Sequence, residues 1–266
     1  MPSILATDQI TRYYGRLCAV DHVSLTVEAG EMFGLLGRNG AGKSTLIKML
    51  TTLLPPTSGN AAIGGYDVRR QSDKVRRLVG YVPQALSADG ELTGYDNLLI
   101  FAKTYDVPRA LRADLIEECL DFMGLADAAH RLVKTYSGGM VRRLEIAQSM
   151  LHKPSILFLD EPTIGLDPVA REAVWKHVKR LRELYKTTVF LTTHYMAEAE
   201  ELCSRIAIMR RGKIVALGGT DELKAAHSKR GATLDEIFAH FTEDEKDEDG
   251  GYREIAKARK KARRLQ

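Results

Sequence analysis

The sequence predicts an α/β fold built on a mostly parallel β-sheet. Two short runs, 156–159 and 188–192, consist almost entirely of apolar and β-branched residues, a composition typical of central strands that are covered on both faces. Between them, residues 169–184 have the length and periodicity of a crossover helix. Strands that alternate with helices in this way indicate a parallel sheet with helices packed against it.

The first strand–helix unit begins at 32–36, which we predict to be a buried strand leading into a glycine-rich loop. From Lys43 to Leu53 apolar residues recur at spacings of three and four, which predicts a helix. Pro55 and Pro56 would stop that helix.

Two regions interrupt the alternation. Residues 86–150 have helical periodicity and no convincing strand, which predicts a helical lobe inserted into a domain that spans 1–241. Residues 242–266 are acidic and then basic, so we expect a charged, flexible tail whose deletion leaves activity intact. The sequence has no internal repeats, which predicts that the chain carries the residues for one nucleotide site rather than two.

The composition is that of an ordinary globular protein, with 44% hydrophobic and 28% charged residues. The net charge of +4 is no argument for nucleic-acid binding. Three cysteines stand far apart, as expected of buried thiols in a reducing compartment. No signal peptide is visible, and the longest apolar runs fall short of the roughly 20 residues that span a bilayer. We therefore expect a cytoplasmic protein that reaches a membrane only through a partner.

Residues 37–44 match the phosphate-loop pattern G-x-x-x-x-G-K-[ST]. Glycines at this spacing let backbone N–H groups point at one anion, and the helix that follows adds its positive end. Lys43 would reach the β- and γ-phosphates, and the Ser44 hydroxyl would ligate Mg²⁺. The loop alone predicts a bound nucleotide but leaves kinase, GTPase and motor functions open.

Two carboxylates, Asp160 and Glu161, end the apolar strand at 156–159, and Pro162 then forces the chain out of the strand. In a phosphate-loop enzyme the first acid at such a strand end orients the Mg²⁺ shell. Glu161 would point differently and could take a proton from an attacking water, a role that typically contributes about 10²–10⁴-fold in rate.

A second candidate anion site is formed by Ser137, Gly138 and Gly139. Ser137 is a good N-cap for the helical run that follows, and the two glycines expose N–H groups at the positive end of that helix. Taken alone, the motif also fits a plain capped helix start.

Seven motifs between Ile4 and Leu217 resemble, in order and separation, those of the ATP-binding subunits of ATP-binding-cassette (ABC) transporters. The first motif is Tyr14, which Tyr13 adjoins, and either tyrosine ring could instead belong to the core. The matching residues are Tyr14 for the aromatic ring that stacks on adenine, Gly37, Asn39, Gly40, Ala41, Gly42, Lys43, Ser44 and Thr45 in the phosphate loop, Gln84 in the Q-loop, Ser137, Gly138 and Gly139 in the signature, Asp160 and Glu161 at the strand end, Asp167 in the D-loop, and His194 in the switch.

The resemblance implies an ABC ATPase fold, with an N-terminal antiparallel β subdomain and the inserted helical subdomain. It implies that Glu161, His194 and Gln84 are catalytic, and that Ser44, Gln84 and Asp160 hold Mg²⁺. Two copies would face each other head to tail as a homodimer, so that the signature of one caps ATP in the phosphate loop of the other. A membrane-spanning permease, docked between Gln84 and the helical lobe, would hold the pair at the cytoplasmic side of the cell membrane.

Departures from the usual family motifs indicate which branch of the family this chain resembles. Tyr136 and Met140 replace the usual Leu and Gln of the signature, and Ile164-Gly165 replaces the usual Ser-Ala of the D-loop. The signature variant, with residues 193–200, resembles the exporter branch of daunorubicin-resistance and nodulation-type ATPases, which implies export of a drug, lipid or polysaccharide-like substrate. A soluble ABC ATPase without solute transport, for example in iron–sulfur assembly, is the alternative. A small-molecule kinase would leave the signature and His194 without roles.

Overall fold

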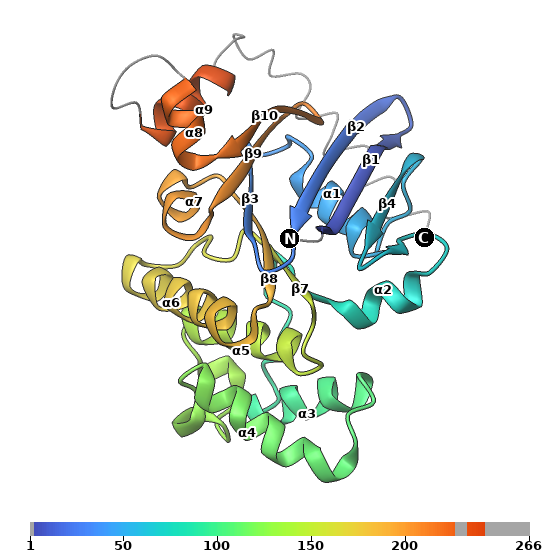
Figure 1. Cartoon of the computed structure of the whole chain (residues 1–266). Helices are drawn as coiled ribbons and strands as arrows, with labels where there is room; N and C mark the ends of the chain where they lie inside the picture. The colour runs from blue at the N-terminus through green and yellow to red at the C-terminus, as the bar shows by residue number, and fades with distance from the viewer. Residues whose placement is uncertain (1–2, 227–232, 243–266) are drawn as a thin grey trace.

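The structure is a computed structural model of the 266-residue chain and describes residues 3–226 and 233–242. A large sheet runs through the middle of the molecule, with a smaller sheet beside it and a helical lobe at one end (Figure 1). The predicted flexible tail lies outside the described residues, apart from Thr242.

The large sheet has six strands in the order β10-β9-β3-β8-β7-β6. The five strands from β9 to β6 pair in parallel, and β10 pairs antiparallel with β9. The predicted α/β fold with a mostly parallel sheet is therefore confirmed. The strands are β3 (Met32–Leu36), β6 (Val79–Val82), β7 (Ile156–Asp160), β8 (Thr188–Thr193), β9 (Arg205–Arg210) and β10 (Lys213–Gly219).

Alternation along the central strands divides the core into two layers. Phe33 and Phe158 both pack on Phe190 with ring centroids 5.3 Å apart, and they belong to the cluster that includes helix α1 (Lys43–Leu50). Leu159 and Leu191 belong to the other cluster, together with helices α5 (Gly138–Met150), α6 (Pro168–Tyr185) and α7 (Met196–Leu202). Successive side chains point to opposite faces of a strand, so both faces of this sheet are buried.

The smaller sheet is antiparallel in the order β2-β1-β4-β5, and it confirms the N-terminal β subdomain that the resemblance implied. Helix α1 packs between the two sheets, because its buried residues join a cluster with residues of β1 and β2. The strands are β1 (Ser3–Tyr14), β2 (Leu17–Glu28), β4 (Ser58–Ile63) and β5 (Tyr66–Asp67).

The first helix is shorter than the sequence predicts. It ends at Leu50 rather than Leu53. Thr52 has a left-handed backbone with φ of 64°, and the Leu53 side chain is 61% exposed. A left-handed residue stops the ladder of helical hydrogen bonds, so the prediction that Leu53 belongs to this helix is wrong.

The segment 86–150 consists of helices and turns, with one isolated bridge between Thr93 and Leu132. Thr93 caps the first of these helices by accepting a hydrogen bond from Asp96 N at 3.0 Å. The helices are α3 (Gly94–Thr104), α4 (Arg112–Phe122) and α5, with short 3₁₀ turns at Arg109–Leu111, Ala126–Ala128 and Val133–Thr135. Outside this segment lie α2 (Ser72–Leu78), α8 (Thr220–Ala226) and α9 (Leu234–Thr242).

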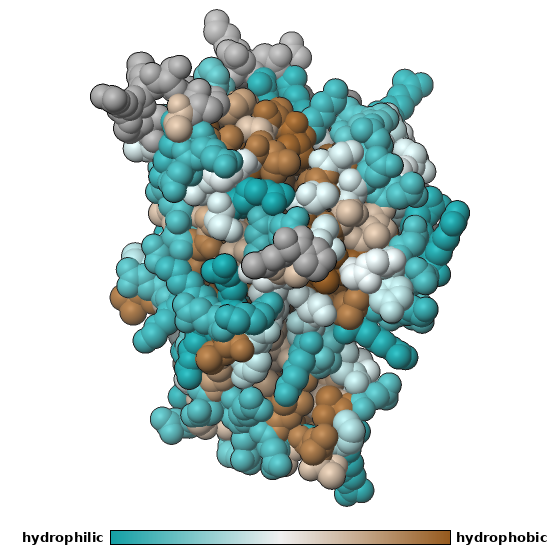
Figure 2. Space-filling model, in the orientation of Figure 1, coloured by the Kyte–Doolittle hydropathy of each residue, from teal (hydrophilic) through white to brown (hydrophobic). Residues whose placement is uncertain are grey.

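Exposed apolar side chains are interspersed with polar ones over most of the face in Figure 2. They gather at two places, at the end of the molecule that carries β10 and over the helical lobe. Val215 and Leu217 are exposed on β10, and Ile100 and Leu111 are exposed in the lobe.

Candidate active site

The phosphate loop connects β3 to α1, at the carboxyl end of the sheet. Gly40 and Gly42 have φ values of 88° and 113°, a region that favours glycine. A Cβ on Gly42 would lie 2.3 Å from Ala19 O, and one on Gly37 would lie 2.6 Å from Met209 O. These glycines therefore let the loop pass close to the backbone of neighbouring strands. Asn39 is exposed in the loop, and Thr45 is buried in the first turn of α1.

Lys43 lies beneath this loop. Its Nζ donates a hydrogen bond to Gly37 O at 2.6 Å and forms an ion pair with Glu161 Oε1 at 3.1 Å. The two charged side chains are only 4% and 5% exposed. Burying two charges requires that they be paired, and here the lysine of the phosphate loop is paired with the predicted base.

Asp160 is buried at the end of β7, and two hydroxyl groups converge on its carboxylate. Ser44 Oγ donates to Asp160 Oδ1 at 3.1 Å, and Thr192 Oγ1 donates to the same oxygen at 2.7 Å. A carboxylate next to a hydroxyl is the oxygen donor set that Mg²⁺ prefers. The described residues include no group of three or more acidic, histidine or cysteine side chains that could hold a metal. Asp160 and Ser44 nevertheless offer two neighbouring oxygens of the kind that bind Mg²⁺.

Glu161 has a left-handed backbone, with φ of 50°. Its N–H donates to Thr192 O at 3.1 Å and to Thr192 Oγ1 at 3.0 Å, and both contacts hold this conformation. Non-glycine residues in this region cost on the order of 1 kcal/mol and cluster at functional sites. The turn separates the directions of the two adjacent carboxylates, so Asp160 faces Ser44 while Glu161 faces Lys43.

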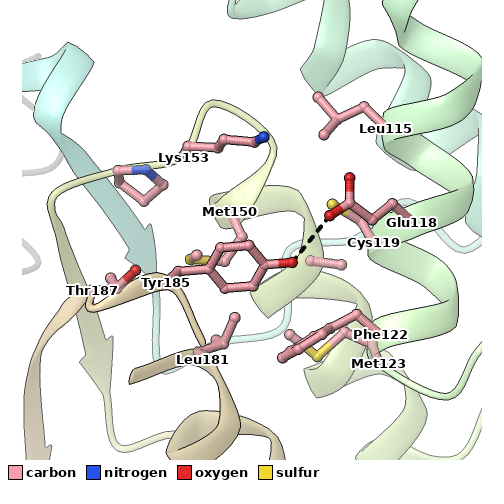
Figure 3. A pocket seen from close by; sticks show the side chains of 12 residues that line it. Leu115, Glu118, Cys119, Phe122, Met123, Met150, Lys153, Leu181, Tyr185 and Thr187 are labelled. Carbon is pink, nitrogen blue, oxygen red and sulfur yellow. Dashed lines mark hydrogen bonds between the residues drawn. The ribbon is translucent and has the colours of Figure 1, made fainter. Parts of the chain in front are cut away.

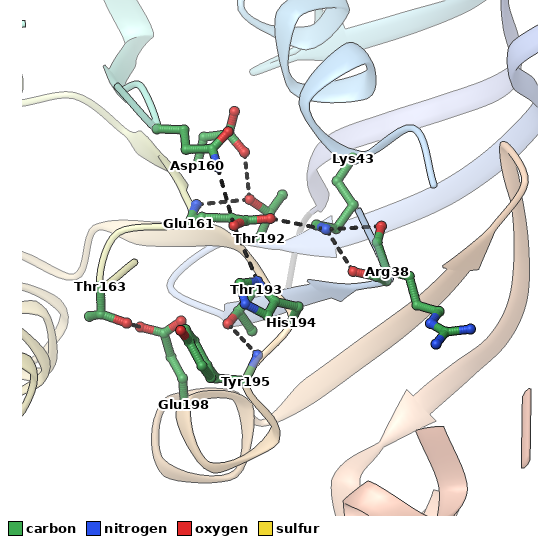
Figure 4. A network of polar contacts seen from close by, with 12 residues as sticks. Arg38, Lys43, Asp160, Glu161, Thr163, Thr192, Thr193, His194, Tyr195 and Glu198 are labelled. Carbon is green, nitrogen blue, oxygen red and sulfur yellow. Dashed lines mark hydrogen bonds and ion pairs between the residues drawn. The ribbon is translucent and has the colours of Figure 1, made fainter. Parts of the chain in front are cut away.

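Three side chains from different parts of the chain meet at the Glu161 carboxylate (Figure 4). Besides Lys43, Gln84 Nε2 donates to Oε2 at 3.4 Å, and His194 Nδ1 lies 3.2 Å from the same oxygen without the alignment of a hydrogen bond. His194 follows directly after β8, and its ring lies 4.3 Å from that of Tyr195. The structure therefore brings Gln84, Lys43, Glu161 and His194 together, while their catalytic roles stay predictions.

The signature residues lie at the start of α5. The Ser137 hydroxyl accepts a hydrogen bond from Met140 N at 3.3 Å, which confirms its predicted place as the helix N-cap. A Cβ on Gly139 would lie 2.8 Å from Ala170 Cβ. Within the described residues, none of Ser137, Gly138 and Gly139 forms a hydrogen bond or ion pair with the phosphate loop of the same chain.

Asp167 and Tyr14 have local contacts in this structure. Asp167 Oδ1 accepts from Ala170 N at 2.9 Å and so caps α6. The Arg12 guanidinium lies 5.0 Å from the Tyr14 ring centroid, a cation–π contact that covers this half-buried ring. Neither residue meets the Glu161 group in the structure, and their roles toward ATP stay predictions.

The comparisons with known proteins decide the family. The family model described as ABC transporter matches residues 20–164. The chain is 46% identical over 222 residues to the daunorubicin/doxorubicin resistance ATP-binding protein DrrA of Streptomyces peucetius, covering 84% of this chain and 67% of that protein. This chain belongs to the ABC transporter family, as an ATP-binding subunit. The linearmycin resistance ATP-binding protein LnrL of Bacillus subtilis is 39% identical, over 83% of this chain and 70% of its own.

Solved structures agree with this membership. The structure of an ATP-binding subunit of an ABC transporter superposes with a TM-score of 0.79 at 30% identity, over 90% of this chain and 99% of that one. A dimeric post-hydrolysis ATP-binding cassette with ADP and Pi superposes with a TM-score of 0.72 at 26% identity, over 81% and 98% of the two chains. The predicted ABC ATPase fold and the ATPase activity coupled to transport are confirmed. ABC subunits pair with a permease and with each other. No helix in the described part of this chain is long and apolar enough to cross a membrane.

The ABC subunit has a polar clamp on its Q-loop that sequence reasoning missed. Arg142 on α5 is fully buried and donates to Pro83 O at 2.7 Å and Gln84 O at 2.8 Å. Glu145 pairs with Arg142 at 2.9 Å and accepts hydrogen bonds from Ser87 Oγ at 3.1 Å and from Ser87 N. Burial lowers the pKa of Arg142, and the nearby Glu145 charge opposes this shift. The helix that carries the signature therefore also holds the segment that carries Gln84.

Two further residues of the site were not predicted. Thr192 orients Asp160 and Glu161 from its place opposite Asp160 in the β7–β8 register. The sequence signal that could have found it is its position at the end of the apolar run 188–192. Glu198 on α7 is fully buried and accepts from Thr163 Oγ1 at 2.8 Å and from Trp175 Nε1 at 2.9 Å. It joins the loop after Glu161 to α6 and α7.

Proposed function

We propose that this chain hydrolyses ATP with Glu161 as the general base and uses the cycle to drive a separate permease that exports a drug-like substrate. The observation that carries this proposal is the buried Glu161 carboxylate, on which Lys43, Gln84 and His194 converge. A general base must lie within hydrogen-bond reach of the proton that it takes, and neighbouring side chains can hold it in that position.

ATP binding would change the partners of Glu161. A nucleotide phosphate in the loop competes for the Lys43 ammonium, which now pairs with Glu161. Losing that partner leaves the carboxylate with Gln84 and His194, both of which can orient it and the attacking water. The pairing of Lys43 with Glu161 thus keeps the base occupied until ATP is present.

The resident metal in this proposal is Mg²⁺. Ser44 and Asp160 would hold it, since their oxygens already lie 3.1 Å apart at the end of the phosphate loop, and Gln84 would complete the protein ligands. When bound, Mg²⁺ would neutralise charge on the phosphate oxygens. Thr192 would keep Asp160 oriented through its hydrogen bond.

The contacts to the adenine ring, and a second set of contacts to the phosphates, would come from residues outside the phosphate loop. Tyr14 would stack on the base, with Arg12 as its present neighbour. Ser137, Gly138, Gly139 and Asp167 would act on ATP held by a second copy, in a head-to-tail homodimer. This arrangement is supported by the dimeric cassette of known structure that this chain resembles, and by the absence of contacts between the signature and the phosphate loop within the described residues of one chain.

The permease would dock in a groove between the core and the helical lobe. The groove holds about 350 Å³ and has apolar and aromatic walls. Leu53 at its edge is exposed, as expected of a side chain that a partner covers. Docking there would place the permease next to the Q-loop and the chain at the cytoplasmic side of the cell membrane. We propose no nucleic acid as a partner. The lining residues are Thr51, Leu53, Arg76, Val79, Tyr81, Phe101, Thr104 and Tyr105.

The exporter function is supported by the names of the relatives. DrrA is named for resistance to daunorubicin and doxorubicin, and LnrL for resistance to linearmycin. Human ABCA3, a phospholipid-transporting ATPase, is 43% identical over 79% of this chain and 12% of its own length. A drug-like amphiphile is therefore favoured over a polysaccharide, and transport over the soluble iron–sulfur alternative.

The test is transport by the reconstituted pair. The chain and a candidate permease are placed in vesicles, and ATP and a fluorescent anthracycline are both added outside, so that export by outward-facing ATP-binding subunits appears as accumulation of the anthracycline inside the vesicles. Export that requires both Mg²⁺ and ATP, and that stops with Lys43→Ala, supports the proposal. ATP hydrolysis that the permease does not stimulate, without any movement of the drug across the membrane, would overturn the exporter function.

A further inference from the structure

A second cavity lies where the helical lobe meets the core, and none of the residues assigned to ATP, Mg²⁺ or catalysis lines it (Figure 3). Its walls come mainly from three successive helices, α4, α5 and α6. The main wall residues are Leu115 and Cys119 from α4, Ala147 and Met150 from α5, and Leu181 and Tyr185 from α6.

The size and walls of the cavity suit one aromatic ring system. It holds about 170 Å³, close to the roughly 150 Å³ of an apolar cavity that accepts benzene. Three sulfur atoms, from Cys119, Met123 and Met150, line it, and sulfur makes favourable contacts with aromatic rings. Burial raises the pKa of the Cys119 thiol to about 12, so this thiol stays neutral and packs as part of an apolar wall.

The rim of the cavity carries polar groups that would orient a ligand. Tyr185 OH donates to Glu118 Oε1 at 3.1 Å. A carboxylate has more acceptor sites than this one bond uses, so Glu118 can also accept an N–H or O–H from a molecule in the cavity. Lys153 lies on the other side of the opening (Figure 3). The rim thus favours a ligand with a hydrogen-bond donor at one end.

We propose that this cavity is a regulatory site for a small aromatic molecule with one N–H or O–H donor, and that its occupancy slows ATP turnover. Helix α5 connects the two sites, because it begins with the signature and ends with Ala147 and Met150 in the cavity wall. A ligand packed against α4, α5 and α6 fixes their spacing, and with it the clamp from Arg142 to the Q-loop. The regulatory effect rests on the proposed role of the signature, whereas binding does not.

The first experiment titrates indole into the full chain by isothermal calorimetry and by NMR, with benzofuran as a ring of the same size that lacks the N–H. We expect saturable binding of indole at one site and about tenfold weaker binding of benzofuran, the loss expected for a hydrogen bond to a charged acceptor. No saturable binding of either compound would overturn the proposal.

Variants then locate the site. Ala147→Leu fills the cavity and should abolish indole binding. Because this buried substitution can impair folding, Leu115→Trp fills the cavity from its half-buried edge as a second test, with circular dichroism to verify both folds. Glu118→Met should reduce indole binding to the benzofuran level, while the adjacent, exposed Glu117→Met should leave it unchanged. Wild-type affinity in a folded Ala147→Leu or Leu115→Trp chain would contradict the assignment.

ATP turnover is measured in the same samples. Indole should lower the rate of the wild type at least twofold and leave Ala147→Leu unaffected. Binding of indole with unchanged turnover would overturn the regulatory part of the proposal. A wild-type chain that binds indole but hydrolyses no ATP would instead contradict the proposed function.

Discussion

Glu145→Gln removes one charge from the clamp on the Q-loop while it keeps the shape of the side chain. Glu145 and Arg142 are paired at 2.9 Å, with both side chains 2% exposed. The variant leaves the Arg142 charge buried without its counter-charge, although the guanidinium keeps its hydrogen bonds to the carbonyls of Pro83 and Gln84. Breaking a buried ion pair in this way costs about 3–5 kcal/mol, and the retained hydrogen bonds favour the lower end of that range.

The assay is urea unfolding followed by circular dichroism, at constant salt and pH 7.5. The chain offers a matched control in Glu91→Gln, since Glu91 and Lys134 are also paired at 2.9 Å but are 78% and 52% exposed. An exposed pair contributes about 0–1 kcal/mol. We expect a loss of about 3 kcal/mol for Glu145→Gln and less than about 1 kcal/mol for the control. Equal losses for the two variants would refute the role of burial in this clamp.

Two further predictions follow from the structure. Gly42→Ala should abolish ATP binding, measured with a fluorescent nucleotide analogue, because the added Cβ would lie 2.3 Å from Ala19 O at a φ of 113°; nucleotide affinity like that of the wild type would show that the loop tolerates the change. Burial lowers the pKa of His152 below its ordinary 6.5, so the unfolded chain takes up a proton first and stability is lost as the pH falls below about 6.5. His152→Gln should make the free energy of unfolding less dependent on pH between 7.5 and 5.5; an unchanged slope would contradict this role of His152.

The central strands could be predicted from sequence because strands that are buried on both faces consist almost entirely of apolar residues. The run at 156–159 is wholly apolar, and β7 is buried at every position. The small antiparallel sheet was different. Its two long strands, β1 and β2, alternate between buried and exposed residues with irregular register, and the residues alone did not identify them. Their prediction came from the family resemblance.

The residues of the site divide in a similar way. Lys43, Asp160 and Glu161 follow strands whose carboxyl ends meet at one edge of the sheet, so their convergence could be predicted. Arg142 and Glu145 could not, because an Arg and a Glu three residues apart on a helix usually form an exposed pair. Only the packing of α5 against the Q-loop shows that this pair is buried. The early end of α1 was missed because it depends on the backbone of Thr52, which has no specific sequence signal.

The central claim is that ATP joins two copies of this chain and that Glu161 then hydrolyses it. The most direct measurement is size-exclusion chromatography with light scattering on Glu161→Gln, with and without Mg²⁺ and ATP. The account predicts a stable dimer only with ATP, hydrolysis at least about 100-fold slower than in the wild type, and no dimer when Lys43→Ala is added. A chain that stays monomeric at saturating ATP, or that hydrolyses ATP at the wild-type rate, would contradict it.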